Sequence, residues 1–223
     1  MILLAVTGLA REAKIIGREG VRVVVSGADA SQLASRLERA IATGARGVIS
    51  VGIAGALDPA LRSGDCVLAT GVTDGVSRHL VDSRWLDAMA RALVPAARTG
   101  LIAGSDLLIS DNSEKFRLRA RTGALTVDME SHFAVRAARD HKIPFAALRI
   151  VADTATSSLP AAARLAVASD GGIRIAAVMR SVLAQPAQIA RLISAARASK
   201  IAFDELFRCL DLLGTGLACP YLG

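Results

Sequence analysis

Aromatic residues are scarce in this chain of 223 residues, since Phe, Trp and Tyr together account for 3% of it. Apolar residues nevertheless make up 52% of the sequence and charged residues 21%, which excludes an intrinsically disordered protein. Alanine supplies much of the apolar fraction, so we expect a core of aliphatic side chains and closely packed helices. The length allows one α/β domain, residues 1–223, with a sizeable core.

Cysteines are few, and the three that occur (Cys66, Cys209 and Cys219) show no paired spacing. This pattern excludes a disulfide framework and a zinc site, and it is typical of a protein of the reducing cytosol. No stretch approaches the roughly 20 uninterrupted apolar residues of a membrane span. The first residues lack the basic start of a signal peptide and meet an acid at Glu12, so we expect a soluble cytoplasmic protein.

Dense runs of positive charge are also missing, although 27 Lys and Arg against 20 Asp and Glu give a net charge of +7. The arginines are scattered along expected helices, as in "RLERAIATGARG", and no aromatic residues lie between them. A nucleic-acid interface would gather such residues on one face. The pattern therefore favours a solvated surface and predicts no nucleic-acid partner.

Short apolar runs alternate with helical patterns and predict the strands of one sheet. Several are continuously aliphatic, as in "VRVVVSG", which is typical of strands covered on both faces. Strands that alternate with helices indicate a three-layer α/β domain around a mostly parallel or mixed sheet. The expected strands span 2–8, 21–27, 46–55, 64–74, 99–109, 123–130 and 143–153.

Two further expectations concern the helices. Ser31 is placed to cap the helix of "QLASRLERAIATG". From Pro160 to Gly214 the pattern is helical, with interruptions near Gly171 and Pro186, while the tail "GTGLACPYLG" shows no clear structure.

Three acids stand where expected strands end: Glu12 after the first, Glu130 in "LTVDMES" and Asp153 in "LRIVAD". In open α/β sheets the ligand crevice lies at the carboxyl ends of the strands. With the glycine turn "GIAGAL", the three acids predict a polar pocket without a metal signature. Each has a structural alternative, since Glu12 suits a helix start and the other two suit capping positions. Asp128 shares a strand face with Glu130 and either supports that acid or forms a surface ion pair.

The order of these pieces resembles the superfamily of purine nucleoside phosphorylases and methylthioadenosine/S-adenosylhomocysteine nucleosidases. The resemblance covers residues 1–155 and implies a three-layer αβα phosphorylase/hydrolase-like fold with a central mixed sheet. The stretches that carry it are "VTGLAREAKII", "SVGIAGAL", "SGDCVLATGV", "GLIAGSDLLI", "VDMES" and "LRIVAD".

The resemblance also implies roles for single residues. Asp153 would protonate the departing base, Glu12 would activate the attacking water, and Met129 and Glu130 would hold the ribose. Asp106, Leu108 and Ile109 would bind the purine, Leu9 would face the 5′ substituent, and the turn under the ribose would comprise Ser50, Gly52, Ile53, Ala54 and Gly55.

These residue types suit the cleavage of an N-glycosidic bond, which places positive charge on the ribose and negative charge on the purine. A carboxyl can protonate the purine near neutral pH only if burial or a neighbouring negative charge raises its pKa. Asp153, at the end of an aliphatic strand, is the candidate for this group. No cofactor is implied.

The sequence says less about the attacking group, water or phosphate, than about the leaving purine. Where the phosphorylases carry a phosphate-binding arginine before the glycine turn, this chain has Ser50, which favours hydrolysis. Phosphate stays open as a co-substrate, because Arg11, Arg46 or Arg78 would be able to replace that arginine.

Within the superfamily the chain most resembles the hopanoid-associated phosphorylase group, which implies adenosylhopane as substrate. A lipid-linked nucleoside needs an apolar groove, for which Leu9, Phe203, Leu206 and Phe207 are candidates, although the last three also suit an ordinary core. Such a substrate implies contact with a membrane surface, and the superfamily implies a homo-oligomer. A methylthioadenosine/S-adenosylhomocysteine nucleosidase, a purine nucleoside phosphorylase and a catalytically silent nucleoside-binding subunit are the alternatives.

Overall fold

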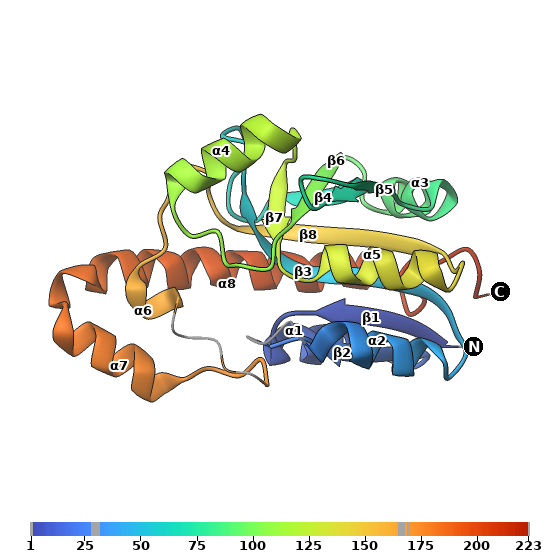
Figure 1. Cartoon of the computed structure of the whole chain (residues 1–223), viewed down its shortest axis with the longest axis horizontal. Helices are drawn as coiled ribbons and strands as arrows, with labels where there is room; N and C mark the ends of the chain where they lie inside the picture. Colours follow the sequence, from blue (N-terminus) through green and yellow to red (C-terminus); the bar gives the residue numbers. More distant parts are fainter. Residues whose placement is uncertain (1, 28–31, 165–167, 169, 223) are drawn as a thin grey trace.

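The computed structural model describes residues 2–27, 32–164, 168 and 170–222, which form helices on both sides of one mixed sheet (Figure 1). The expected three-layer α/β fold with a central mixed sheet is confirmed. The strands are β1 (Ile2–Thr7), β2 (Val21–Val25), β3 (Ala45–Ala56), β4 (Cys66–Thr73), β5 (Arg78–Leu80), β6 (Ala97–Gly104), β7 (Thr126–Asp128) and β8 (Phe145–Asp153).

The sheet runs in the order β2-β1-β3-β7-β6-β4-β5, and β8 pairs with both β3 and β4. Because β3 also pairs with β7, β7 with β6 and β6 with β4, the five strands β3, β7, β6, β4 and β8 form a closed ring. Strands β3 and β8 are parallel and align Gly52 with Arg149 and Gly55 with Asp153. The closed part of the sheet therefore brings the ends of β3, β7 and β8 to one place.

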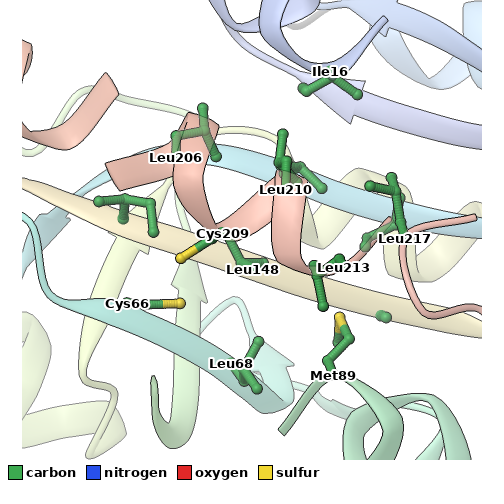
Figure 2. Close-up of a cluster of buried hydrophobic side chains, with 14 of the residues drawn as sticks. Ile16, Cys66, Leu68, Met89, Leu148, Leu206, Cys209, Leu210, Leu213 and Leu217 are labelled. Atoms are coloured by element: carbon green, nitrogen blue, oxygen red, sulfur yellow. The ribbon is translucent and has the colours of Figure 1, made fainter. Parts of the chain in front are cut away.

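Helices cover both faces of the sheet, as their apolar residues require. One core cluster joins α1 (Ala10–Ile16), α3 (Ser83–Ala92) and α8 (Ile189–Leu212) to one face (Figure 2). The other joins α2 (Leu33–Ile41) and α5 (Ser131–Asp140) to the opposite face. Small alanines of β8 and α5 permit this close packing, which agrees with the expected aliphatic core.

The C-terminal part is helical, as expected from its sequence. It consists of α6 (Ala161–Arg164), α7 (Ile175–Ala184), a 3₁₀ helix (Pro186–Gln188) and α8. The tail, for which no structure was expected, is held against α3. Trp85 donates its indole N–H to the carbonyl of Leu217 (2.9 Å), and the hydroxyl of Tyr221 donates to Asp82 Oδ2 (2.9 Å).

Polar caps delimit the helix α4 (Asn112–Thr122), which borders the candidate site. Asp111 accepts a hydrogen bond from the backbone N–H of Ser113 (2.8 Å) at its start. Gly123, with φ of 68°, ends it in the left-handed conformation that glycine adopts without strain. The helix lies on the surface and turns two side chains inward, those of Lys115 and Leu118.

Four local expectations were wrong or incomplete. The stretch "GIAGAL" is not a turn, because β3 continues through Gly52 and Gly55 to Ala56 and pairs there with β7 and β8. The strand expected over 123–130 covers only Thr126–Asp128, the strand expected over 99–109 ends at Gly104, and the strand β5 was not foreseen. The proposed cap at residue Ser31 lies outside the described residues.

No helix among the described residues is both long and apolar enough to cross a membrane.

The packing of α8 predicts a contrast between two neighbouring side chains. Leu206 is fully buried against the sheet, whereas Phe207 is 63% exposed. We expect Leu206→Ala to lower the free energy of unfolding by about 2–5 kcal/mol through the cavity it leaves. The control Phe207→Ala should change it by roughly 0.5 kcal/mol or less. Urea unfolding followed by circular dichroism measures both, and equal effects would contradict the packing of α8.

Candidate active site

A buried arginine, Arg149 of β8, lies at the centre of the candidate site. Its side chain is 1% exposed, and its Nε donates to Asp128 Oδ2 at 2.7 Å. Its Nη2 donates to the hydroxyl of Ser50 (2.6 Å) and to that of Ser131 (3.0 Å). One guanidinium therefore joins β8 to β3, to the end of β7 and to the start of α5.

Asp128 shapes the local chain of "VDMES" as well as binding the arginine. Its Oδ1 accepts hydrogen bonds from the backbone N–H groups of Glu130 (2.9 Å) and Ser131 (2.7 Å). These bonds turn the chain from β7 into α5 and place Glu130 at the N-terminal boundary of the helix. The arginine holds the pKa of Asp128 below its ordinary value although burial opposes this. Asp128 is thus a member of a buried ion pair rather than of a surface pair.

Glu130 lies beside the ion pair of Arg149 and Asp128 but makes only a longer contact with the arginine. Its Oε1 accepts from the hydroxyl of Ser26 at 3.0 Å, and its Oε2 lies 3.7 Å from Arg149 Nη2. Burial and the carboxylates of Asp128 and Glu12 raise the pKa of Glu130 to about 7, which outweighs the opposing arginine. This carboxyl therefore changes its protonation state near neutral pH.

Glu12, on the first turn of α1, is held by donors from two strands and a turn. Its Oε2 accepts from the hydroxyl of Thr7 and from the backbone N–H groups of Gly8 (3.0 Å) and Leu9 (2.8 Å). Its Oε1 accepts from the N–H of Ile53 at 2.7 Å. Burial raises the pKa of Glu12, while these hydrogen bonds oppose the rise. Glu12 therefore does have the helix-start role that the sequence allowed, and its Oε1 in addition binds the backbone of β3.

Asp153 ends β8 and meets a cation that the sequence analysis had passed over. Its Oδ2 forms an ion pair with Nζ of Lys115, and its side chain is 17% exposed. Burial raises the pKa of Asp153, and the lysine opposes the rise. A Cβ on Gly55 would lie 3.3 Å from Asp153 Oδ2, so the carboxylate rests against β3.

The acids fall into two groups along β3. Glu12 lies against Gly52, where a Cβ would come within 2.6 Å of Oε1, and Asp153 lies against Gly55. Glu130 belongs to the first group, because a Cβ on Gly8 would lie 2.8 Å from its Oε1. Gly52 and Gly55, which mark the two groups, lie three residues apart, so their Cα atoms are about 10 Å apart along the strand.

The other expected site residues lie around these groups. Ser50, Gly52, Ile53, Ala54 and Gly55 are all on β3, where Ser50 binds Arg149 and Ile53 binds Glu12. Met129 is half-buried between the two acids of "DME", and Leu9 is half-buried at the start of α1.

The segment expected to bind the purine follows β6. Asp106 is exposed and its Oδ1 lies 2.9 Å from Nε2 of His132, a buried residue of α5. Leu108 is 45% exposed and Ile109 half-buried. A cavity of about 290 Å³ opens beside this segment, and Asp106, Ile109 and His132 contribute to its lining.

None of the arginines named as substitutes takes part in the polar network described above. Arg46 and Arg78 are exposed, and Arg11 stacks on the ring of Phe203 at 4.2 Å. Sequence reasoning missed Arg149, although a signal was present: it is the charged residue inside the aliphatic strand of "LRIVAD". Within the described ranges, no group of His, Cys, Asp and Glu side chains is arranged to hold a metal ion.

The C-terminal side chains that were candidates for an apolar groove lie in two different environments. Phe203 and Leu206 belong to the core cluster between α8 and the sheet, so they are ordinary core residues rather than the lining of a groove. Phe207 is exposed.

Comparison with known proteins identifies the family. The model of the Phosphorylase superfamily matches residues 7–184, most of the chain. The chain belongs to the Phosphorylase superfamily. The expected enzyme class, a nucleosidase or phosphorylase, is confirmed at this level, and no curated protein sequence matches the chain significantly.

Solved structures agree with the fold across the whole length of the chain. A methylthioadenosine/S-adenosylhomocysteine nucleosidase from Neisseria meningitidis in complex with methylthio-immucillin-A has a TM-score of 0.70 at 17% identity, covering 97% of this chain and 100% of that one. An S-adenosylhomocysteine nucleosidase from Streptococcus pyogenes has a TM-score of 0.66 at 16% identity, covering 96% and 97%. A futalosine hydrolase mutant of Helicobacter pylori has a TM-score of 0.63 at 15% identity, covering 95% and 99%.

The raised pKa of Glu130 predicts how stability depends on pH. Because the carboxyl titrates at about 7 in the folded protein and at its ordinary 4.5 when unfolded, the free energy of unfolding should fall as the pH rises between these values. The fall attributable to Glu130 should be roughly 3 kcal/mol. Urea unfolding at pH 5 and pH 8 should show a smaller fall for Glu130→Gln than for the wild-type chain. An equal fall in both would contradict the assignment.

Proposed function

We propose that the protein cleaves the N-glycosidic bond of a 5′-modified adenosine with water and releases adenine. The observation that carries this proposal is that three acids with raised pKa values lie against glycines of β3 and of the turn after β1. Glu12 and Glu130 form the first group and Asp153 the second. Similar structures support the choice of substrate, since a Helicobacter pylori nucleosidase mutant (TM-score 0.64, 15% identity, 94% of this chain and 98% of that one) holds 5′-methylthioadenosine in its active site.

The first group of acids suits the sugar. Positive charge develops on the ribose as the bond breaks, and the carboxylates of Glu12 and Glu130 stabilise it. Glu130 accepts hydrogen bonds from the ribose hydroxyls while Met129 packs against the ring. Glu12 Oε1 receives the proton of the attacking water, whose oxygen forms the new bond to the anomeric carbon.

Asp153 suits the departing base. A purine that leaves with the electron pair of the broken bond needs a proton at a ring nitrogen, and a carboxyl with a raised pKa supplies it. Burial gives Asp153 such a pKa. In this assignment Leu108, Ile109 and Asp106 border the purine.

Water suits the first group better than phosphate does. The charge of Arg149 is already matched by Asp128, and Glu130 lies 3.7 Å away. A phosphate placed there would face carboxylates as well as the guanidinium, which disfavours an anion. Phosphate therefore enters this proposal only as a minor alternative.

The 5′ substituent is proposed to be bulky and apolar, as in adenosylhopane. The N–H of Ala10, next to Leu9, donates to the carbonyl of Gly171 at 3.0 Å, so the chain that enters α7 borders the expected 5′ position. The side chains that follow are apolar and exposed: Ile173, Ile175, Met179 and Leu183. Together with Arg174 and Arg180 they suit contact with an anionic membrane surface. A small thioether at the 5′ position, as in the similar nucleosidases, is the second candidate.

The first prediction from this proposal concerns the acid at the base. With 5′-methylthioadenosine or a 5′-alkyl adenosine, chromatography should detect adenine and free ribose sugar, with or without phosphate. Asp153→Asn should lower kcat by about 10²–10⁴-fold, because the purine would leave without a proton. The exposed Asp140→Asn serves as the control and should retain activity. A ribose 1-phosphate product would overturn the choice of water, and an active Asp153→Asn variant would remove the assigned acid.

The second prediction concerns the 5′ group. If α7 borders it, kcat/KM should rise with the length of a 5′-alkyl chain. Met179→Asp should abolish this rise and leave turnover of 5′-methylthioadenosine unchanged. Leu80→Asp is the matched control, since Leu80 is 72% exposed on β5 at the opposite edge of the sheet. Turnover that is independent of chain length would contradict the lipid-like substrate and favour the small thioether.

A further inference from the structure

Lys115 is a fully buried lysine whose ammonium has a complete set of acceptors. Its side chain is 0% exposed. Its Nζ donates to Asp153 Oδ2, to the carbonyl of Thr154 at 2.9 Å and to the carbonyl of Ser157 at 3.0 Å. Three protons with three acceptors define a charged ammonium rather than a neutral amine.

Burial of Lys115 costs free energy that its ion pair and hydrogen bonds must offset. Apart from Leu118, helix α4 is mostly exposed, and Glu114 and Phe116 on either side of Lys115 face the solvent. Burying an ammonium carries a large desolvation penalty, and an apolar residue of similar size often serves stability equally well. The cation is nevertheless directed at the carboxylate that ends β8 and at the loop that follows it.

We propose that Lys115 is a positioning residue for the leaving-group acid, which fixes the carboxyl of Asp153 and sets the pH range in which that carboxyl carries a proton. The proposal rests on the proposed function, because it gives Asp153 the role of acid.

Among the residues that the structure describes, Lys115 is the cation in contact with Asp153. On α4, Glu114 and Arg117 are exposed, and Arg119 is paired with Asp58 at 2.8 Å. On β7, Asp128 is paired with Arg149, and on β3 the residue against Asp153 is Gly55. Glu12 lies with the first acid group, against Gly52. Burial raises the pKa of Asp153 and Lys115 opposes the rise, so removal of the ammonium must raise that pKa further.

The same contact has a consequence for the chemical step. As the bond between the sugar and the purine breaks, its electron pair goes to the purine. The O–H bond of Asp153 breaks and a new N–H bond forms on the base. The carboxylate that remains lies beside the ammonium of Lys115, which stabilises it. Lys115 therefore makes Asp153 a stronger acid, while it reduces the fraction that is protonated at a given pH.

The decisive experiment is the pH profile of adenine release by Lys115→Met and Lys115→Arg. In the wild-type chain kcat/KM should fall on the alkaline side as Asp153 loses its proton. Lys115→Met should move this limb to higher pH by about 1–3 units, because an opposite charge at contact distance is lost. Lys115→Arg, which keeps the charge, should leave the limb in place. A purely structural role would lower the activity at every pH without moving the limb, and that result would overturn the proposal.

A second measurement covers the case in which Lys115→Met does not fold. The chemical shift of the labelled Lys115 side chain is followed by NMR against pH in the wild-type chain and in Asp153→Asn, which retains the lysine. In the wild-type chain this shift should report the titration of the neighbouring Asp153, and the same step should be missing in Asp153→Asn. A wild-type profile without that step would contradict the coupling. This titration needs no turnover, so a chain that releases no base would remove the proposed function while the coupling is still tested.

Discussion

The ion pair between Arg149 and Asp128 is the interaction on which the rest of the site depends. It joins the middle of β8 to the end of β7, and through Ser50 and Ser131 it also holds β3 and the start of α5. An arginine buried in this way is tolerated only with its partners in place. In the stretch "VDMES", Asp128 therefore has a structural role. Glu130, two residues later, is the residue proposed to bind the ligand.

This arrangement separates the acids by their surroundings. Asp128 is kept ionised by the arginine, whereas Glu130, two residues later, titrates at about 7 because Asp128 and Glu12 add to its burial. Asp153 meets a different cation, Lys115, at the end of β8. Carboxyls with pKa values pushed apart are what acid and base steps at one pH require.

The elements of the fold could be predicted from the sequence because they depend on local patterns. Continuous aliphatic runs predicted the buried strands, and the helical pattern expected from Pro160 to Gly214 contains α8. The partners of the acids could not be predicted in the same way. Asp128 and Arg149 are 21 residues apart, and Lys115 and Asp153 are 38 apart. Such pairs depend on strand register and on the direction of a helix face, which no short motif encodes.

The same limit explains why the glycines of "SVGIAGAL" suggest a turn when only the sequence is considered. Glycine in an aliphatic strand commonly marks a bend or a close approach by another group, and the sequence does not distinguish these. Here the close approach applies, since a Cβ on Gly52 would meet Glu12 Oε1 at 2.6 Å. Gly8 stands in the same relation to Glu130, at 2.8 Å. Because these glycines have no side chain, the carboxylates of Glu12 and Glu130 can lie directly against the backbone. The positions of these acids therefore depend on the absence of a Cβ at Gly52 and Gly8 as well as on their hydrogen-bond donors.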